Sequence, residues 1–236
     1  MLDLGTTEFI LAVPSLPETQ LKRLSTSLFD EWEGFVDTAL SLPDYSLLLQ
    51  VEEGSVRGVA KIGAVVGALY LGIGNYGDFI SGVKTIGEQI SATSEFLSEQ
   101  AKQVFECPDA KATSRRRGGT ISGLQRLFVR VQKGELSPDQ AMELAERLLG
   151  DQRDQEPGFT QALANAFDDC PRYHKQDSLP FLERLDDAPP TPLVSAPPSL
   201  PRESRQGVQL GPPLQLRVEV WRDSKKKRRR TRVVKL

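Results

Sequence analysis

The chain has few of the residues on which most metal, redox and acid–base chemistry depends. Among its 236 residues there is one histidine, His174, and there are two cysteines, Cys107 and Cys170. A single histidine excludes sites that need two, either as metal ligands or as an acid–base pair. Two cysteines provide no disulfide framework, and the spacing of the cysteines and the histidine matches no zinc finger. We therefore expect no catalytic residue, no metal site and no cofactor in this chain.

Longer sequence features are missing as well. Met1-Leu2-Asp3-Leu4-Gly5 places an acidic residue, rather than a basic region, ahead of the first apolar run. That start is not typical of a cleaved signal peptide, so we expect a cytoplasmic protein. The uncharged apolar stretch 62–76 has fifteen residues, whereas a membrane-spanning helix needs about 20. No G-x-x-x-x-G-K-[ST] phosphate-binding loop is present.

The composition suits one packed core and a part that does not pack. Hydrophobic residues make up 39% of the chain and charged residues 26%, with the hydrophobic share below the globular average. The net charge of −2 conceals a segregation, because residues 214–236 carry ten basic and two acidic side chains, a net +8. The rest of the chain therefore carries a net −10. Such asymmetry is typical of a chain with an interaction arm.

An α+β body is predicted for residues 1–106. Thr7–Val13 is a short apolar run that ends at a proline, which is typical of a strand. Ser15-Leu16-Pro17-Glu18 is typical of a helix start, and apolar residues follow it at helical spacing. Tyr45–Val51 is a second strand candidate, so strand, helix and strand predict a parallel βαβ unit. A second long amphipathic helix begins at Phe79, and we expect the small sheet to pack on both helices.

The segment Val59–Gly77 is apolar and rich in glycine, and it has three interpretations. The first is a buried helix or hairpin whose glycines let another element approach closely. We favour it because the segment is shorter than a membrane span. In the second, the segment inserts into a membrane, with Gly63-x-x-x-Gly67 as a helix-packing motif. The third takes Gly72-Ile73-Gly74-Asn75-Tyr76-Gly77 as a dinucleotide fingerprint, although Asp78 would place a negative charge where phosphates bind.

The middle of the chain divides into a polar loop and a helical module. Residues 107–118 are polar and contain Arg115-Arg116-Arg117, so we expect a loop there. From 119 to 186 we expect a helical hairpin module. Gly134 ends its first helix, and Ser137-Pro138-Asp139-Gln140 begins the second as a capping box with proline at the first helical position.

A proline-rich linker at 187–213 leads to a basic arm at 214–236. Apolar and polar residues alternate from Leu214 to Trp221, and a turn-like stretch and further apolar residues follow, which predicts a β-hairpin. Cationic arms bind phosphate backbones, and a tryptophan stacks on an unpaired base. The residues expected to bind nucleic acid are Trp221, Arg222, Lys225, Lys226, Lys227, Arg228, Arg229, Arg230 and Arg232.

These features favour a non-enzymatic binding or accessory protein whose basic arm engages a polyanion, with nucleic acid as the preferred partner. We expect the linker to hold the arm clear of the acidic body, so that the arm binds independently of it. One alternative is a small membrane-active effector that inserts residues 59–77 and uses the arm on anionic lipid. Another is a nucleotide-binding enzyme that uses the fingerprint at 72–77. A third possibility for the arm is that it folds back on the acidic body or pairs with a partner protein's sheet edge.

Overall fold

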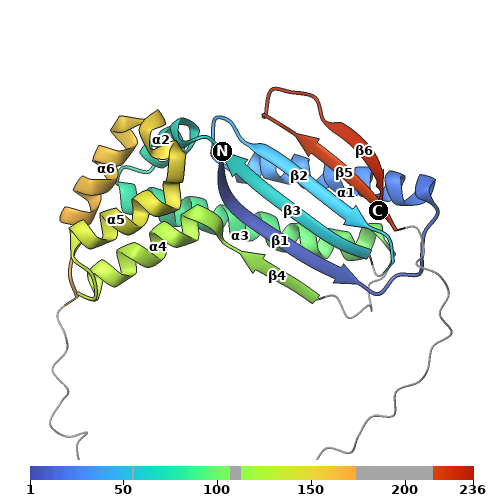
Figure 1. Cartoon of the computed structure of the whole chain (residues 1–236), viewed down its shortest axis with the longest axis horizontal. Coiled ribbons are helices and arrows are strands. Elements are labelled where there is room, and N and C mark those ends of the chain that lie inside the picture. The colour runs from blue at the N-terminus through green and yellow to red at the C-terminus, as the bar shows by residue number, and fades with distance from the viewer. Residues whose placement is uncertain (55, 107–112, 174–214) are drawn as a thin grey trace, which may run out of the picture. The chain divides into compact units, whose positions relative to one another are not determined.

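Six strands form one antiparallel sheet in the order β4-β1-β3-β2-β5-β6 (Figure 1). In this computed structural model the described residues are 1–54, 56–106, 113–173 and 215–236. Cys107, His174 and the predicted linker 187–213 lie outside them. The strands are β1 (Leu2–Leu11), β2 (Ser46–Glu52), β3 (Val56–Ala64), β4 (Thr113–Arg117), β5 (Leu216–Arg222) and β6 (Arg230–Lys235).

Helices and this single sheet make up the described structure, which confirms the predicted mixture of α and β elements. The helices are α1 (Glu18–Ala39), α2 (Val66–Gly74), α3 (Phe79–Val104), α4 (Gly119–Gln132), α5 (Pro138–Leu149) and α6 (Pro157–Asp168). A short 3-10 helix, η1 (Gly150–Gln155), connects the last two.

The predicted parallel pairing of the first two strands is wrong. β1 and β2 run in the same direction, but β3 lies between them and pairs antiparallel with both. A tight connection after β2, in which Gly54 has a positive φ of 107°, turns the chain straight back into β3. β3 therefore occupies the position that a parallel pairing would have given to β1, and α1 connects two strands that are not neighbours.

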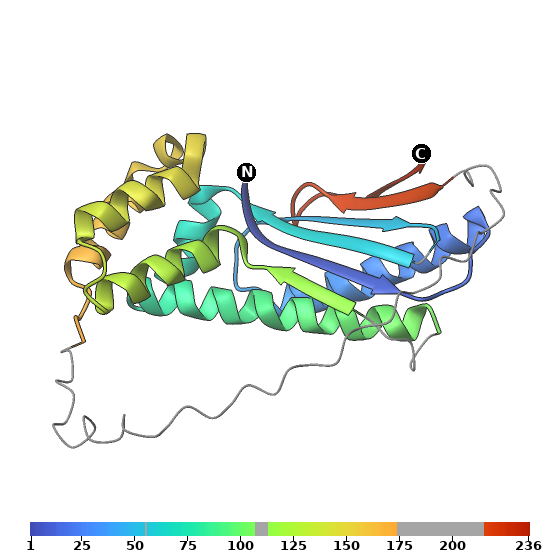
Figure 2. The ribbon, with the colours of Figure 1, turned by 60° about the horizontal axis from the view of Figure 1, so that its bottom comes forward.

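The two long helices cover one face of the sheet. α1 packs on β2 and β5, and α3 packs on β1, as Figure 2 shows with both helices beneath the strands. Because successive side chains of a strand point to opposite faces, every second strand residue enters this layer. The buried side chains include Phe9, Leu47, Leu49, Val218 and Val220 from the strands and Leu28, Phe29, Trp32, Val36, Ile86 and Leu97 from the helices. Burial of each large side chain contributes about 1.5–3 kcal/mol to this core.

The glycine-rich segment 59–77 is divided between two elements. Its first part is in β3, and its second part forms α2 and the turn to α3. The expected close approach is present at Gly72 of α2, where a Cβ atom would overlap Leu42 Cδ2 and lie 3.2 Å from the backbone oxygen of Ser41. Gly82 of α3 likewise lies close to α2, since a Cβ atom there would be 2.6 Å from the backbone oxygen of Ile73. Apolar α2 has nine residues and the long helices are amphipathic, so no described helix meets both the length and the hydropathy of a bilayer span.

The predicted helical hairpin is confirmed in α4 and α5. Gly134 has a φ of 70° after α4, and the N–H groups of Gly134 and Glu135 donate to the carbonyls of Val131 and Arg130, which completes a Schellman motif. At the start of α5, the N–H of Gln140 donates to Ser137 Oγ at 3.2 Å. The N–H of Ser137 donates in turn to Gln140 Oε1 at 3.0 Å. Both halves of the predicted capping box are therefore formed.

Part of the predicted loop 107–118 is a strand. Residues 113–117 form β4, which pairs antiparallel with β1 at the edge of the sheet. All five residues of β4 are exposed, so the strand has no apolar side from which sequence alternation could be detected. Backbone pairing with β1, rather than burial of side chains, defines this strand.

The predicted β-hairpin of the basic arm is confirmed, because β5 and β6 pair antiparallel. The prediction that the arm stands apart from the body is wrong, because β5 also pairs with β2 from Arg217 to Arg222. The physical reason is that the apolar residues of the alternating pattern need a core in which to be buried. Val218 and Val220 are fully buried in the common core, whereas a free arm would leave them in water.

Candidate functional site

The sheet face opposite α1 and α3 is crossed by no described helix, as Figures 1 and 2 both show. We call it the open face. In antiparallel pairs, directly opposed residues place their side chains next to each other on the same face. Strand register therefore assembles the residues of the open face into rows that run across the six strands.

One of these rows contains Trp221 and has no acidic side chain. We call it the Trp221 row, and from β4 to β6 it consists of Arg117, Thr6, Lys61, Leu48, Trp221 and Arg230. Six strands about 4.8 Å apart give the row a length of about 24 Å. Its three cations are exposed, and Leu48 and Trp221 are half-buried side by side. The row therefore combines an apolar, aromatic centre with cations at both ends and in the middle.

On one side of this row lies Asp3, whose carboxylate accepts a hydrogen bond from Thr6 Oγ1 at 3.1 Å. The two rows that follow on its other side contain both signs of charge. They consist of Arg115, Glu8, Val59, Gln50, Glu219 and Arg232, and of Thr113, Ile10, Arg57, Glu52, Arg217 and Val234. Each acid pairs with an arginine of an adjacent strand: Glu8 with Arg117 at 3.1 Å, Glu52 with Arg217 at 2.5 Å and Glu219 with Arg232 at 2.6 Å. The three rows together contain seven basic and three acidic side chains, a net +4, which Asp3 beside them reduces to +3.

The residues that the sequence predicted as binding residues divide into three groups. Trp221, Arg230 and Arg232 lie on the open face. Lys226, Lys227 and Arg228 are exposed at the tip of the β5–β6 loop, and none of them has an ion pair with another described residue. Arg222, Lys225 and Arg229 are directed to the body of the protein.

Arg222 is held in a buried cluster that we call the hairpin clamp, formed by Arg222, Glu33, Asp37 and Tyr45. Only 6% of the Arg222 side chain is exposed. Its Nη1 lies 2.8 Å from Glu33 Oε1, and its Nη2 donates to Asp37 Oδ1 at 2.9 Å. The Tyr45 hydroxyl donates to the same Asp37 oxygen. The clamp fastens β5 to α1, and it keeps Arg222 out of reach of a polyanion at the surface.

The contacts within the clamp shift the pKa values of its three acidic groups. Burial tends to raise the pKa of the Asp37 carboxyl, but hydrogen bonds from Arg222 and Tyr45 outweigh it and hold that pKa below its usual value. At Glu33, burial outweighs the attraction of Arg222 and raises the pKa of the carboxyl. Burial and the hydrogen bond to Asp37 raise the pKa of the Tyr45 hydroxyl, which stays protonated at neutral pH. Burial, hydrogen bonding and ion pairing within the fold together account for these shifts.

A second contact fastens the start of the β5–β6 loop. Asp44 Oδ1 accepts hydrogen bonds from Ser224 Oγ and from the backbone N–H of Lys225, both at 2.8 Å. These bonds outweigh the effect of burial and hold the pKa of the Asp44 carboxyl below its usual value. The Lys225 ammonium lies 5.5 Å from the centre of the Tyr45 ring, and Arg229 pairs with Asp30 of α1. The loop is therefore attached to the body at both ends, while its tip is exposed.

The glycine motif at 72–77 and Cys170 do not lie in surroundings that suit a binding or catalytic site. Gly72 and Gly74 lie inside α2, whereas a dinucleotide fingerprint requires a strand before its first glycine. Asp78 caps α3 by accepting from the N–H of Ser81 at 2.8 Å, so a carboxylate occupies the helix start. Cys170 is buried, which raises the pKa of its thiol. No group of three potential metal ligands occurs among the described residues.

Sequence reasoning missed five cations of the open face: Arg57, Lys61, Arg115, Arg117 and, within the basic arm itself, Arg217. The signal for the first two was present, since Arg57, Val59 and Lys61 alternate with smaller or apolar residues along β3. The alternation was overlooked because the end of β3 overlaps the glycine-rich segment 59–77. Arg115 and Arg117 are likewise two residues apart and share one face of β4. All residues of β4 are exposed, so no apolar side reveals the alternation in the sequence.

Comparison with known proteins identifies no family for this chain. No family model matches it, and neither a curated protein nor a solved structure is significantly similar to it. The open face and its neighbourhood are therefore the features that indicate a function.

Proposed function

We propose that this protein binds single-stranded nucleic acid on the open face of its sheet, with Trp221 as the stacking residue. The observation that carries the proposal is the Trp221 row, a line of three exposed cations around a half-buried tryptophan. Arg117 and Arg230 of this row pair with Glu8 and Asp223 beside it, and Lys61 has no ion pair with a described residue. A single strand complements both parts of this row. Its phosphates pair with cations, and its unpaired bases stack on an indole ring.

A single strand fits the open face better than a duplex does. The bases of a duplex are stacked on one another, so only an unpaired base offers its face to Trp221. In the proposed complex the strand crosses the β-strands along the Trp221 row, and its phosphates lie near Arg117, Lys61 and Arg230. The exposed loop tip, 226–228, adds three cations beyond the end of the row. The acidic remainder of the chain repels a polyanion and so favours this face.

In this proposal the binding surface belongs to the whole sheet rather than to the basic arm. The hairpin supplies Trp221 and Arg230, but β3 supplies Lys61 and β4 supplies Arg117. A peptide of residues 215–236 should therefore bind a single strand more weakly than the intact protein. The membrane-inserting alternative would require β3 to leave the centre of the sheet, where it pairs with β1 and β2.

Fluorescence anisotropy with a labelled oligonucleotide of about 12 nucleotides tests the proposal, since that length lies within the range of single-strand-binding OB folds. Trp221→Ala should weaken binding roughly 5- to 150-fold, which corresponds to about 1–3 kcal/mol of stacking. Trp221→Phe should retain most of the affinity, because phenylalanine also offers an aromatic face. Arg147→Gln is the control, since Arg147 is an exposed arginine on α5, outside the open face.

Salt dependence and a duplex complete the test. The three phosphates neutralised by the row should contribute about −2 to the slope of log affinity against log salt for a single strand. A duplex of the same length should bind more weakly and should not respond to Trp221→Ala. The proposal is wrong if the intact protein fails to bind the single strand at low salt, or if Trp221→Ala has no more effect than Arg147→Gln.

A further inference from the structure

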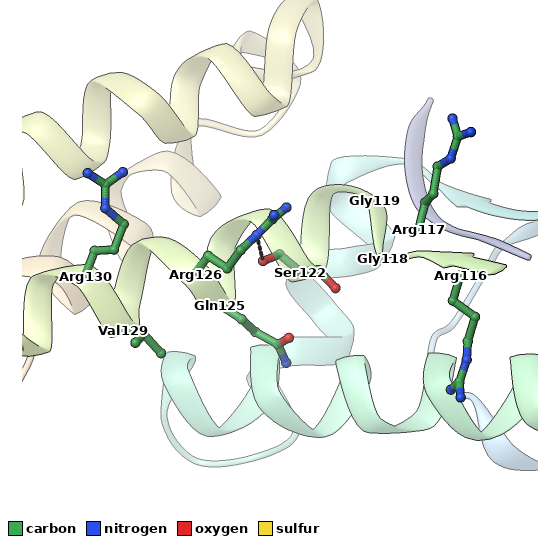
Figure 3. A pocket seen from close by; sticks show the side chains of 9 residues that line it. All are labelled: Arg116, Arg117, Gly118, Gly119, Ser122, Gln125, Arg126, Val129 and Arg130. Carbon is green, nitrogen blue, oxygen red and sulfur yellow. Dashed lines mark hydrogen bonds between the residues drawn. The ribbon is translucent and has the colours of Figure 1, made fainter. Parts of the chain in front are cut away.

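A cleft of about 930 Å³ lies where β4 meets α4 (Figure 3). Its lining includes four arginines, Arg116, Arg117, Arg126 and Arg130, and it includes no acidic residue. We call it the arginine cleft. A cavity of this size with a purely cationic set of ionisable groups is suited to anions and above all to several phosphates in succession.

The arginines of the cleft point in two directions, as Figure 3 shows. Arg116 is directed to α3, where its Nη1 lies 2.9 Å from Glu95. Gln125 points the same way and donates to the backbone oxygen of Val83 at 3.2 Å. Arg117, Arg126 and Arg130 point to the opposite side. That second side is the one on which the cleft presents its available guanidinium groups.

The available arginines are held only by contacts at the surface. Arg126 donates from Nε to the backbone oxygen of Ser122 at 3.1 Å and forms no ion pair with a described residue. Arg130 pairs with Glu135 at 3.5 Å, and Arg117 pairs with Glu8 at 3.1 Å. The arginine of each pair is exposed to solvent, which weakens the ion pair, so a phosphate can displace the carboxylate.

Arg117 belongs to both the cleft and the Trp221 row. It is the terminal residue of the row on β4, and Arg126 and Arg130 follow on α4, about 6 Å apart along the helix axis. We infer that the arginine cleft continues the binding surface of the open face. One strand of nucleic acid then runs from Trp221 across the sheet to α4, with phosphates on Arg117, Arg126 and Arg130. This inference rests on the proposed function.

Two oligonucleotides of different length separate the cleft from the sheet. One of about 5 nucleotides should occupy the sheet alone, and one of about 12 should also reach α4, both within known site sizes. Two additional phosphates should steepen the salt slope from about −2 to about −3.5. Arg126→Gln combined with Arg130→Gln should return the slope of the long oligonucleotide to about −2 and leave the short one unchanged. Lysine at both positions should preserve the steeper slope, because the charge is kept.

The controls distinguish this inference from the proposed function. If the short oligonucleotide binds through Trp221 but the long one gains nothing, or if the double glutamine variant matches Arg147→Gln, the cleft is not part of the site. Inorganic phosphate is compared with chloride at equal ionic strength. If phosphate specifically removes the gain of the long oligonucleotide, the cleft is a pocket for a free phosphate group, and the inference is overturned. Failure of both oligonucleotides at low salt overturns the inference together with the proposed function.

Discussion

Replacing Arg222 by methionine should lower the free energy of unfolding by about 2–3 kcal/mol, because it leaves two carboxylates of the hairpin clamp without their cation. Removing one partner of a fully buried ion pair typically costs about 3–5 kcal/mol. Glu33 and Asp37 retain 20% and 35% exposure of their side chains, so water screens part of the unpaired charge. The expected loss is therefore at or below the lower end of that range. Methionine keeps much of the apolar stem, which limits the loss of packing.

Arg217→Met is the matched control on the same strand. Arg217 lies on the open face and pairs with Glu52 at 2.5 Å, but both side chains are about 30% exposed. Loss of that pair should cost about 1 kcal/mol or less. Urea unfolding followed by tryptophan fluorescence measures both variants, because Trp32 is buried in the core. A double-mutant cycle of Arg222→Met with Asp37→Asn should give a coupling energy of at least about 1 kcal/mol.

The contribution of the clamp to the free energy of unfolding depends on pH in a defined direction. The folded-state pKa of Asp37 is depressed, so the stability that Asp37 contributes is present above its unfolded value, about 3.9, and is lost as pH falls through the folded pKa. Glu33 has the opposite sign, because its raised folded-state pKa makes its ionised form unfavourable for the fold. The difference between wild type and Arg222→Met should therefore persist from pH 5 to neutral pH and shrink below about pH 4. An equal stability of Arg222→Met and Arg217→Met, or a coupling energy near zero, would refute the structural role of the clamp.

Three further predictions concern the fold. Ser137→Ala should cost about 1 kcal/mol in urea unfolding through loss of the capping box, and an unchanged midpoint would contradict the cap. Gly82→Ala should destabilise by about 1–3 kcal/mol because its methyl group would meet a backbone carbonyl, whereas Gly74→Ala, with no atom within 4 Å of the added carbon, should be neutral or stabilising. A tagged peptide of residues 215–236 should capture co-expressed residues 1–173, because strand pairing, burial and the hairpin clamp hold β5 on the body, and failure to co-purify would argue against a shared core.

Local signals were sufficient where the structure depends on neighbours in the chain. Ser137 and Gln140 are three residues apart, and Gly134 ends the preceding helix by itself, so the α4–α5 connection was predictable in detail. The β-hairpin of 214–236 was predictable because Val218 and Val220 alternate with polar residues. In each case the energetic reason for the element is present within a few residues.

Sequence reasoning failed where the partner of an element is distant. Nothing within β5 identifies β2 as its neighbour, and nothing in Arg222 distinguishes it from the other cations of the arm. The difference arises from Glu33 and Asp37, nearly 190 residues away, which surround Arg222 only in the folded state. β4 was missed for a related reason, since its exposed arginines form a strand only because β1 offers a backbone to pair with. The Trp221 row combines residues of all six strands, so it becomes visible only when their register is known.

The position of β5 has a consequence for how the protein is made. Gln50 and Glu219, which share a hydrogen bond at 3.2 Å, are 169 residues apart in the chain. During translation, residues 1–173 leave the ribosome while one edge of β2 still lacks its neighbour. At about 5–20 residues per second, the 62 residues from 174 to the end of β6 at 235 require about 3–12 s.

An unpaired strand edge in a nascent chain is a site for aggregation, and charged side chains beside such an edge oppose it. Glu33, Asp37 and Asp44 lie along this edge, on the surface that the hairpin later covers. Until the hairpin arrives they are uncompensated negative charges, which repel a second nascent chain that carries the same three residues. The basic hairpin then neutralises them as it completes the sheet, so the residues that delay association between chains are those that secure the final strand pair.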